Sequence, residues 1–335
     1  MPVTAKQIAK ELNLSQTAVS MALNGKPGVS TATRRLIVQK AEEMGYDFER
    51  IRSRSVRTGD ICCVICRTKN AILRYDPIFS ELITGMEQEC ERNFFRLKTL
   101  RINGEEDDIL RCIEELRVTG CDGIVLVSTE LSPDIARRFL GCGIPTVLVD
   151  ASYLSLNLSS VLIDNIQGSY LASSYLIEHY GTQPGHLVST VEIPNFRERR
   201  YGYERALQEH GMSTGKSICH VLPPNIDGAF TDMLRILDDG DPLARCYVAD
   251  NDLIAIGVIK ALRLRGLSVP DDVAVIGFDN ITEGKILDPA LTTVDVPRNY
   301  MGKTACRQLL YEIRSTLPHH LRTLVNVTLV KRMSA

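Results

Sequence analysis

The feature that most constrains the fold is a regular alternation of short apolar runs with amphipathic segments after residue 60. The apolar runs predict buried strands, and helical patterns lie between them near residues 77–93, 105–119 and 133–141. The first strands predicted in this way are ICCVIC from Ile61, FRLKTL from Phe95, GIVLV from Gly123 and PTVLV from Pro145. This order predicts an α/β fold with a parallel sheet that helices cover on both faces.

A second series of the same kind follows the first. It begins at SVLID from Ser160 and continues through HLVST, ICHVL, CYVAD and VAVIGF, again with helical patterns between the runs. Two open parallel sheets make two lobes, and such sheets bind ligands at the carboxyl ends of their strands. The crevice between the lobes is therefore the predicted ligand site.

The first 46 residues have a different pattern, that of three short helices. Thr4, Ser15 and Ser30 are each placed to cap a helix start. Apolar residues follow each cap at helical spacing: Ile8, Ala9 and Leu12; Ala18, Val19, Ala22 and Leu23; Leu36, Ile37 and Ala41. Two short helices a few residues apart predict a helix-turn-helix, which binds DNA. A three-helix packing module that touches no DNA is the alternative.

Charge is distributed unevenly along the chain. Residues 1–58 carry ten Lys and Arg against five Asp and Glu, whereas the remainder carries 29 against 36. A basic segment on an acidic body is typical of a phosphate-binding module attached to a domain that avoids DNA. A merely solvated basic face would give the same counts.

The second helix is the predicted recognition helix. Gln16 can pair with an adenine edge through two hydrogen bonds, and Thr17 and Met21 can contact a thymine methyl. The predicted phosphate contacts are hydroxyl and amide side chains near helix starts and turns: Thr4, Ser15, Ser20, Asn24 and Ser30.

The stretch TAKQIAKELNLSQTAVSMALNGKPGVSTATRRLIVQKAEEMGY resembles the headpiece of the lactose/galactose repressor family (LacI/GalR type). The resemblance implies a helix-turn-helix headpiece over residues 1–46 in a sequence-specific, DNA-binding transcriptional repressor. Met21 stands where the family usually has an arginine, so the operator sequence is expected to differ.

The resemblance also implies a hinge over residues 47–59, where the family usually has a helix whose leucine enters the minor groove. Here Phe48 and Glu49 replace the usual Pro-Asn, and Ser55 replaces the leucine. The arginines Arg50, Arg52 and Arg54 remain as candidates to contact phosphates or a narrow minor groove. Whether the hinge helix forms stays open.

The second half resembles the family's effector domain, whose fold is shared with periplasmic sugar-binding proteins. The matching segments include CDGIVLV, RRYGYERALQEHG and ADNDLIAIGVIKALRLRGLSVPDDVAVIGFDN. The resemblance implies an effector and dimerisation domain over residues 60–335, with a final crossing back between lobes. The expected lobes are residues 60–158 with 294–318, and residues 159–292 with 322–335, the second ending in one strand, LVNVTLVKR.

Three polar residues are the first candidates for effector contacts. Arg199 is expected at a helix start, Asn251 follows the strand CYVAD, and Asp279 follows the strand VAVIGF. By resemblance they bind the hydroxyls or carboxylate of a sugar or related metabolite, with Asp76 and Phe79 adding an acceptor and a wall. The alternative is that Asn251 and Asp279 cap helices and that Arg199 forms an ion pair between the lobes.

Other function classes are disfavoured. The sequence lacks a phosphate loop, a GxGxxG after the first strand, a GxSxG elbow and HExxH, so no enzyme and no cofactor is expected. The ten cysteines are scattered in apolar stretches, which predicts buried thiols and no metal. Without an apolar span or signal sequence, no membrane partner and a cytoplasmic location are expected. The expected partners are double-stranded DNA at a pseudo-palindromic operator, a small-molecule effector and a second copy in a homodimer.

Overall fold

The computed structural model describes residues 3–23, 29–46, 59–67, 77–315 and 319–335. The N-terminal helices and the α/β body belong to separate compact units, so each is described by itself. Within the part of the chain that is described, no helix is both long enough and apolar enough to cross a membrane.

The N-terminal unit contains three helices, α1 (Ala5–Glu11), α2 (Gln16–Leu23) and α3 (Thr31–Glu43). The Ser15 hydroxyl accepts the backbone N–H of Ala18 at 3.1 Å, and Ser30 accepts that of Thr33 at 3.1 Å, so both serines cap as their positions predict. Fully buried side chains from all three helices form the small core: Ile8, Val19, Ile37 and Ala41.

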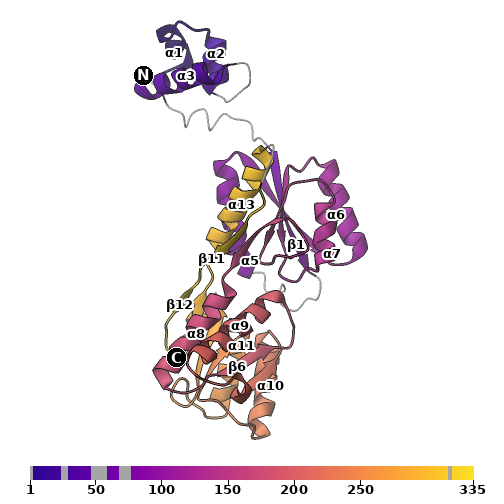
Figure 1. Ribbon diagram of the computed structural model, residues 1–335, viewed down its shortest axis with the longest axis vertical. Coiled ribbons are helices and arrows are strands. Elements are labelled where there is room, and N and C mark those ends of the chain that lie inside the picture. The colour runs from indigo at the N-terminus through magenta and orange to yellow at the C-terminus, as the bar shows by residue number, and fades with distance from the viewer. Residues whose placement is uncertain (1–2, 24–28, 47–58, 68–76, 316–318) are drawn as a thin grey trace. The chain divides into compact units, whose positions relative to one another are not determined.

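Lobe 1 of the body is a parallel sheet with helices on both faces (Figure 1). Its strand order is β11-β5-β4-β3-β1-β2. The strands are β1 (Gly59–Arg67), β2 (Phe95–Asn103), β3 (Gly123–Val127), β4 (Thr146–Val149), β5 (Ser159–Ile163) and β11 (Arg322–Val325). Helices α6 (Glu106–Val118) and α7 (Pro133–Leu140) cover one face, and α5 (Pro77–Arg92) and α13 (Arg298–Arg314) cover the other.

Lobe 2 repeats this arrangement with the strand order β12-β10-β9-β8-β6-β7. Its strands are β6 (Gly185–Ser189), β7 (Cys219–Leu222), β8 (Cys246–Ala249), β9 (Ala274–Asp279), β10 (Thr292–Asp295) and β12 (Thr328–Val330). Its helices are α8 (Asn165–Tyr180), α9 (Pro194–Glu209), η1 (Thr214–Lys216), α10 (Ile226–Asp238), α11 (Asp252–Leu264) and α12 (Thr282–Ile286). The two-lobed α/β architecture is the one the sequence predicts.

The lobe boundaries differ from the prediction in two places. Strand β5 lies in the first sheet, because Val161 pairs with Val149 of β4, and so the second lobe begins after it. Strand β10 lies wholly in the second sheet, where it pairs with β9. An apolar run is equally suited to either sheet, so its composition does not reveal which neighbour it pairs with.

The prediction that LVNVTLVKR forms a single strand is also wrong. The segment forms two strands in different sheets: β11 pairs in parallel with β5, and β12 pairs antiparallel with β10. The chain therefore passes between the lobes three times, after β5, after β10 and after β11.

The cysteines of β1 alternate between the two faces of the strand. Cys62 and Cys66 pack with Val64 in the core beneath α6 and α7, whereas Cys63 is buried in the opposite face. All ten cysteines are free thiols, and the described residues contain no cluster of three His, Cys, Asp or Glu side chains suited to a metal ion.

Candidate functional site

A pocket lies where the carboxyl ends of strands from both lobes meet. Its empty space is about 700 Å³ with the open mouth included. Most of its wall is apolar, with Phe79, Val149, Ile193, Phe196 and Met301 among the lining residues. The polar residues that line it are Thr129, Asp150, Asn195, Arg199, Asn251, Asp279 and Arg298. An apolar pocket with a few convergent polar groups is the usual form of a small-molecule site.

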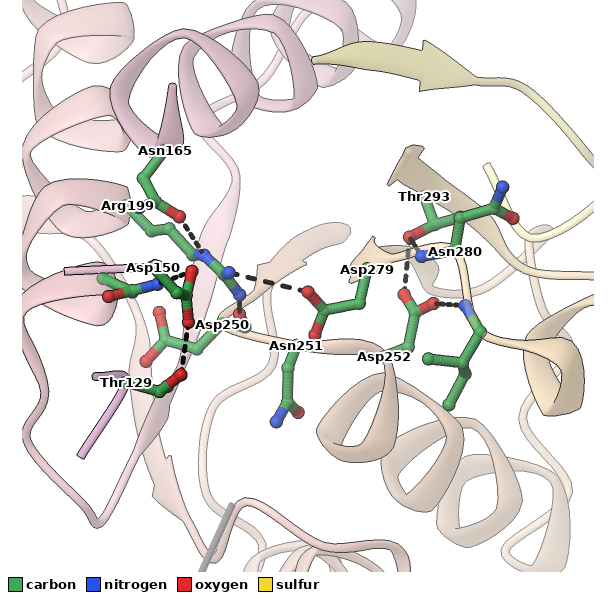
Figure 2. A network of polar contacts seen from close by, with 12 residues as sticks. Thr129, Asp150, Asn165, Arg199, Asp250, Asn251, Asp252, Asp279, Asn280 and Thr293 are labelled. Atoms are coloured by element: carbon green, nitrogen blue, oxygen red, sulfur yellow. Dashed lines mark hydrogen bonds and ion pairs between the residues drawn. The ribbon is translucent and has the colours of Figure 1, made fainter. Parts of the chain in front are cut away.

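Arg199 holds the centre of the polar cluster (Figure 2). Its Nε donates to Oδ1 of Asn165 at 2.9 Å, its Nη1 donates to the Asp250 carbonyl, and its Nη2 lies 3.6 Å from Oδ1 of Asp279. Its guanidinium also stacks on the Phe278 ring, 3.6 Å from the centroid. Helix α9 begins at Pro194, so Arg199 lies in the second turn and not at the helix start that the sequence suggested.

Two arginines converge on Asp279 at the end of β9. Nη2 of Arg298 lies 3.3 Å from Oδ1 of Asp279, and its Nη1 donates to the Asp279 carbonyl at 2.6 Å. Arg298 begins α13 of lobe 1, so this contact joins the lobes. Asp279 has φ +118, a backbone conformation that residues other than glycine rarely adopt. The two guanidinium groups offset the cost of burying this carboxylate.

Asp150, at the end of β4, makes the second polar link between the lobes. One of its carboxylate oxygens accepts the Thr129 hydroxyl at 2.6 Å, and the other accepts the amide of Asn195 from lobe 2 at 2.9 Å. Burial raises the pKa of Asp150, and the two hydrogen bonds partly oppose that change. Asp150 is therefore a carboxyl group with acceptor capacity to spare in the pocket wall.

Asn251 caps a helix, which was one of the two alternatives, and it also lies in the pocket wall. Its Oδ1 accepts the backbone N–H of Ile254 at 2.9 Å and caps α11, while the residue also lines the pocket. The next residue, Asp252, is buried and accepts the N–H of Ile281 at 2.9 Å and the hydroxyl of Thr293 at 2.5 Å. Burial and the nearby Asp279 raise the pKa of Asp252 to about 7.

The predicted recognition helix α2 presents a free face. Gln16, Thr17 and Ser20 are exposed and Met21 is half-buried, whereas Val19 and Ala22 face the core. Three of the predicted phosphate contacts, Thr4, Ser15 and Ser30, are exposed next to helix starts. Other predicted residues lie outside the described ones: Asn24, the hinge residues Arg50, Arg52, Arg54 and Ser55, and Asp76.

Over nearly its whole length, the chain is similar to known transcriptional repressors. Residues 174–335 match the family model of the periplasmic binding protein-like domain. The chain is 28% identical to the HTH-type transcriptional repressor PurR of Aliivibrio salmonicida, over 95% of this chain and 94% of that protein. It is 26% identical to the ribose operon repressor of Haemophilus influenzae, over 99% of this chain and 98% of that one.

Solved structures have a similar fold over most or nearly all of the chain. The transcriptional regulator CelR in complex with cellobiose has a TM-score of 0.74 and 25% identity, over 99% of this chain and 100% of that one. A LacI family regulator from Enterococcus faecium with bound ribose has a TM-score of 0.69 and 26% identity, over 82% of this chain and 98% of that one.

The chain is similar to transcriptional repressors of the lactose/galactose family over nearly its whole length. It is a DNA-binding repressor regulated by a small-molecule effector, and it is not an enzyme. The regulator acts on DNA, as its repressor relatives do.

Four of the five predicted effector residues lie in the regulator's pocket: Phe79, Arg199, Asn251 and Asp279. Three further polar lining residues were not predicted from the sequence: Asp150, Asn195 and Arg298. Asp150 had a usable signal, because it follows the strand TVLV as Asp279 follows VAVIGF. The sequence contains no comparable signal for Arg298, because its partner Asp279 is 19 residues earlier and on the other lobe.

Proposed function

We propose that this regulator is a homodimer that binds a pseudo-palindromic operator through two headpieces. Its affinity for the operator falls or rises when a sugar or related metabolite binds between its lobes. The observation that carries the proposal is the pocket itself, whose polar groups come from both lobes and meet at Asp150–Asn195 and Asp279–Arg298. A ligand that bonds to these groups biases the lobe arrangement, and its differential affinity for two arrangements is what allostery requires.

The effector contacts proposed are Arg199, Asn251, Asp279 and Phe79, with Asp76 completing the set. Asn251 uses its oxygen as a cap and keeps an amide group with two donors for a ligand. Carboxylates such as Asp279 accept sugar hydroxyls, and the aromatic and aliphatic wall suits the apolar face of a sugar ring. The solved relatives with bound cellobiose and ribose support a sugar as the ligand class.

The base contacts proposed are Gln16, Thr17 and Met21, on the face of α2 that the headpiece core leaves free. The side chain of Gln16 is long enough to reach a base edge from the first turn of a recognition helix. Because Gln16 and Thr17 are exposed, placing α2 in a major groove requires no unpacking of the core.

The phosphate contacts proposed are Thr4, Ser15, Ser20, Asn24 and Ser30, with Arg50, Arg52, Arg54 and Ser55 acting in the hinge. The Ser15 hydroxyl accepts a backbone N–H, so its own proton remains available for a phosphate oxygen, whereas the Ser30 hydroxyl also bonds to the Thr33 hydroxyl at 2.7 Å. The helix starts that they cap add N–H groups and a favourable dipole for an anion.

The domain organisation proposed is a headpiece over residues 1–46, a hinge over 47–59 and an effector and dimerisation domain over 60–335. A dimer places two recognition helices on successive turns of DNA, which supplies the affinity that one half-site lacks. The location proposed is the cytoplasm, which DNA binding supports.

The test is selection of DNA sites by the purified regulator, followed by titration of the best site in the presence of D-ribose, cellobiose and hypoxanthine. A two-fold symmetric consensus is expected, together with a change in operator affinity for a sugar. A consensus without symmetry would overturn the dimeric arrangement. A response to hypoxanthine alone would overturn the sugar assignment but leave DNA binding intact.

A further inference from the structure

Two buried thiols face each other in the core of lobe 1, outside the effector pocket. Cys90 lies near the end of α5 and Cys306 lies in the middle of α13. Their Sγ atoms are 3.7 Å apart, and neither residue is exposed to solvent. The two cysteines are 216 residues apart in sequence, so the pair is not apparent from any local motif.

The backbones of the two helices touch next to this pair. A Cβ added at Gly85 would lie 2.0 Å from the Asn299 carbonyl oxygen, and one at Gly302 would lie 2.1 Å from the Leu82 oxygen. Each cysteine is about one turn further along its helix from this contact. The helices therefore hold the sulfur atoms within ~1.7 Å of disulfide bonding distance.

We propose that Cys90 and Cys306 form a disulfide when the regulator meets a small peroxide, and that this pair is an oxidisable modification site. One thiol reacts with hydrogen peroxide to give a sulfenic acid and one water. The other thiol then attacks that sulfur, which forms the S–S bond and releases a second water. The two thiols lose two electrons, the peroxide gains two, and a dithiol reductant reverses the change.

The burial of the two thiols and the raised pKa of Cys306 determine which oxidants can react with them. Hydrogen bonding with Cys90 and burial raise the pKa of the Cys306 thiol, so the reactive thiolate is scarce at neutral pH. Oxidation is accordingly slow, becomes faster as the pH rises, and favours a small uncharged molecule over a bulky disulfide such as oxidised glutathione.

The bond would act on the effector pocket because the same two helices line it. The first turns of α5 contribute Phe79 and Leu82, and the first turn of α13 contributes Arg298 and Met301. A covalent link between these helices fixes one part of the pocket wall relative to the other. Oxidation thus restricts movement of α5 relative to α13 on the lobe 1 side of the pocket, and the disulfide itself does not contact the ligand.

The experiment is peptide mapping of the full-length regulator after hydrogen peroxide, with free thiols blocked by iodoacetamide before trypsin digestion. Cleavage after Arg and Lys gives a peptide of residues 75–92 whose one cysteine is Cys90, and a peptide of residues 304–307 whose one cysteine is Cys306. We expect these peptides joined, with the loss of two hydrogens. Their yield should increase as the pH of the treatment increases.

Cys306→Ala should abolish the cross-linked peptide, whereas Cys142→Ala, at a half-exposed cysteine, should leave it unchanged. The oxidised regulator should also melt about 5 °C or more above the reduced one, a difference that Cys306→Ala removes. Recovery of both peptides with blocked thiols after the exposed Cys219 has been oxidised would overturn the proposal. So would linkage of Cys90 to a different cysteine.

Discussion

Asp150 of lobe 1 and Asn195 of lobe 2 are joined across the cleft by a hydrogen bond of 2.9 Å between a half-buried carboxyl and a buried amide. The Asp150 carboxylate also accepts the Thr129 hydroxyl, which lies on its own lobe. The bond from Asn195 is therefore the polar link through which lobe 2 holds the Asp150 carboxyl in the pocket wall.

Replacing Asn195 by Leu should weaken the α/β body. The change keeps the volume but removes the donor, so the half-buried Asp150 carboxyl loses the hydrogen bond from lobe 2, at a cost of about 1.5–3 kcal/mol. The measurement is the free energy of unfolding of the body from guanidinium denaturation. Asn157→Leu, at an exposed position, is the matched control, and an equal loss in both variants would contradict a specific role for the bond.

Asp279→Asn should uncouple the effector from the operator. The substitution keeps the shape of the side chain but removes the negative charge that Arg199 and Arg298 share, so ligand hydroxyls lose their strongest acceptor. We expect unchanged operator affinity without effector and at least a tenfold weaker effector response, or about 1.4 kcal/mol. Fluorescence anisotropy of labelled operator measures both quantities.

The control for this variant is Asp288→Asn, because the Asp288 side chain is 92% exposed and lies outside the pocket lining. An undiminished response in Asp279→Asn would move the effector contacts elsewhere in the cleft. A loss of operator affinity in the absence of effector would indicate instead that the variant disturbs folding.

Gln16→Ala should reduce specific binding to the operator by about 1–3 kcal/mol while nonspecific binding changes little. The reason is that an adenine pair contributes only on the correct sequence, whereas phosphate contacts contribute on all sequences. Parallel titrations of the operator and of a scrambled duplex at one salt concentration distinguish the two. Gln39→Ala, on α3, should change neither affinity, and an equal loss on both duplexes with Gln16→Ala would exclude a base contact.

The buried Asp252 should make the regulator less stable as the pH rises. Its pKa is raised from 3.8 to about 7 in the folded chain, so the folded state favours the neutral form. The stability from this group is complete below about pH 4 and is lost as the pH rises through 7, by about 4 kcal/mol at most. Asp252→Asn should remove that loss from the pH dependence of the free energy of unfolding.

Comparing Asp252→Asn with the wild type removes the contribution that all other titratable groups make to the pH dependence of stability. Asp271→Asn, at an exposed carboxylate, should retain the wild-type pH dependence. Identical profiles for Asp252→Asn and the wild type would show that Asp252 is ionised throughout this range.

The strands and the headpiece helices were predictable because each depends on local chemistry. Strand β3 is a run of five apolar or small residues, and Ser15 and Ser30 are good caps in any context. The sheet to which β5 and β11 belong was not predictable. It depends on which strand lies alongside, and the pairing of β11 with β5 joins residues 162 apart.

The candidate site was predictable where one rule applied, that a polar residue after a buried strand faces the ligand crevice. Asn251 and Asp279 follow from it, and Asp150 follows from it equally although it was overlooked. Arg298 and Asn195 do not follow from this rule, because they lie in the first turns of helices. Their function depends on partners that folding brings from the other lobe.

The division of residues 322–330 between the edges of both sheets has a consequence for synthesis. Neither sheet gains its edge strand until residues 322–330 have left the ribosome, because β11 completes the first sheet and β12 the second. Ser334 then donates to the Val275 carbonyl and receives the N–H of Thr292, which fastens the chain end to lobe 2. A nascent chain that stalls before Arg322 therefore exposes two unpaired strand edges, β5 and β10, at once, and an abundant truncated product of this kind should aggregate.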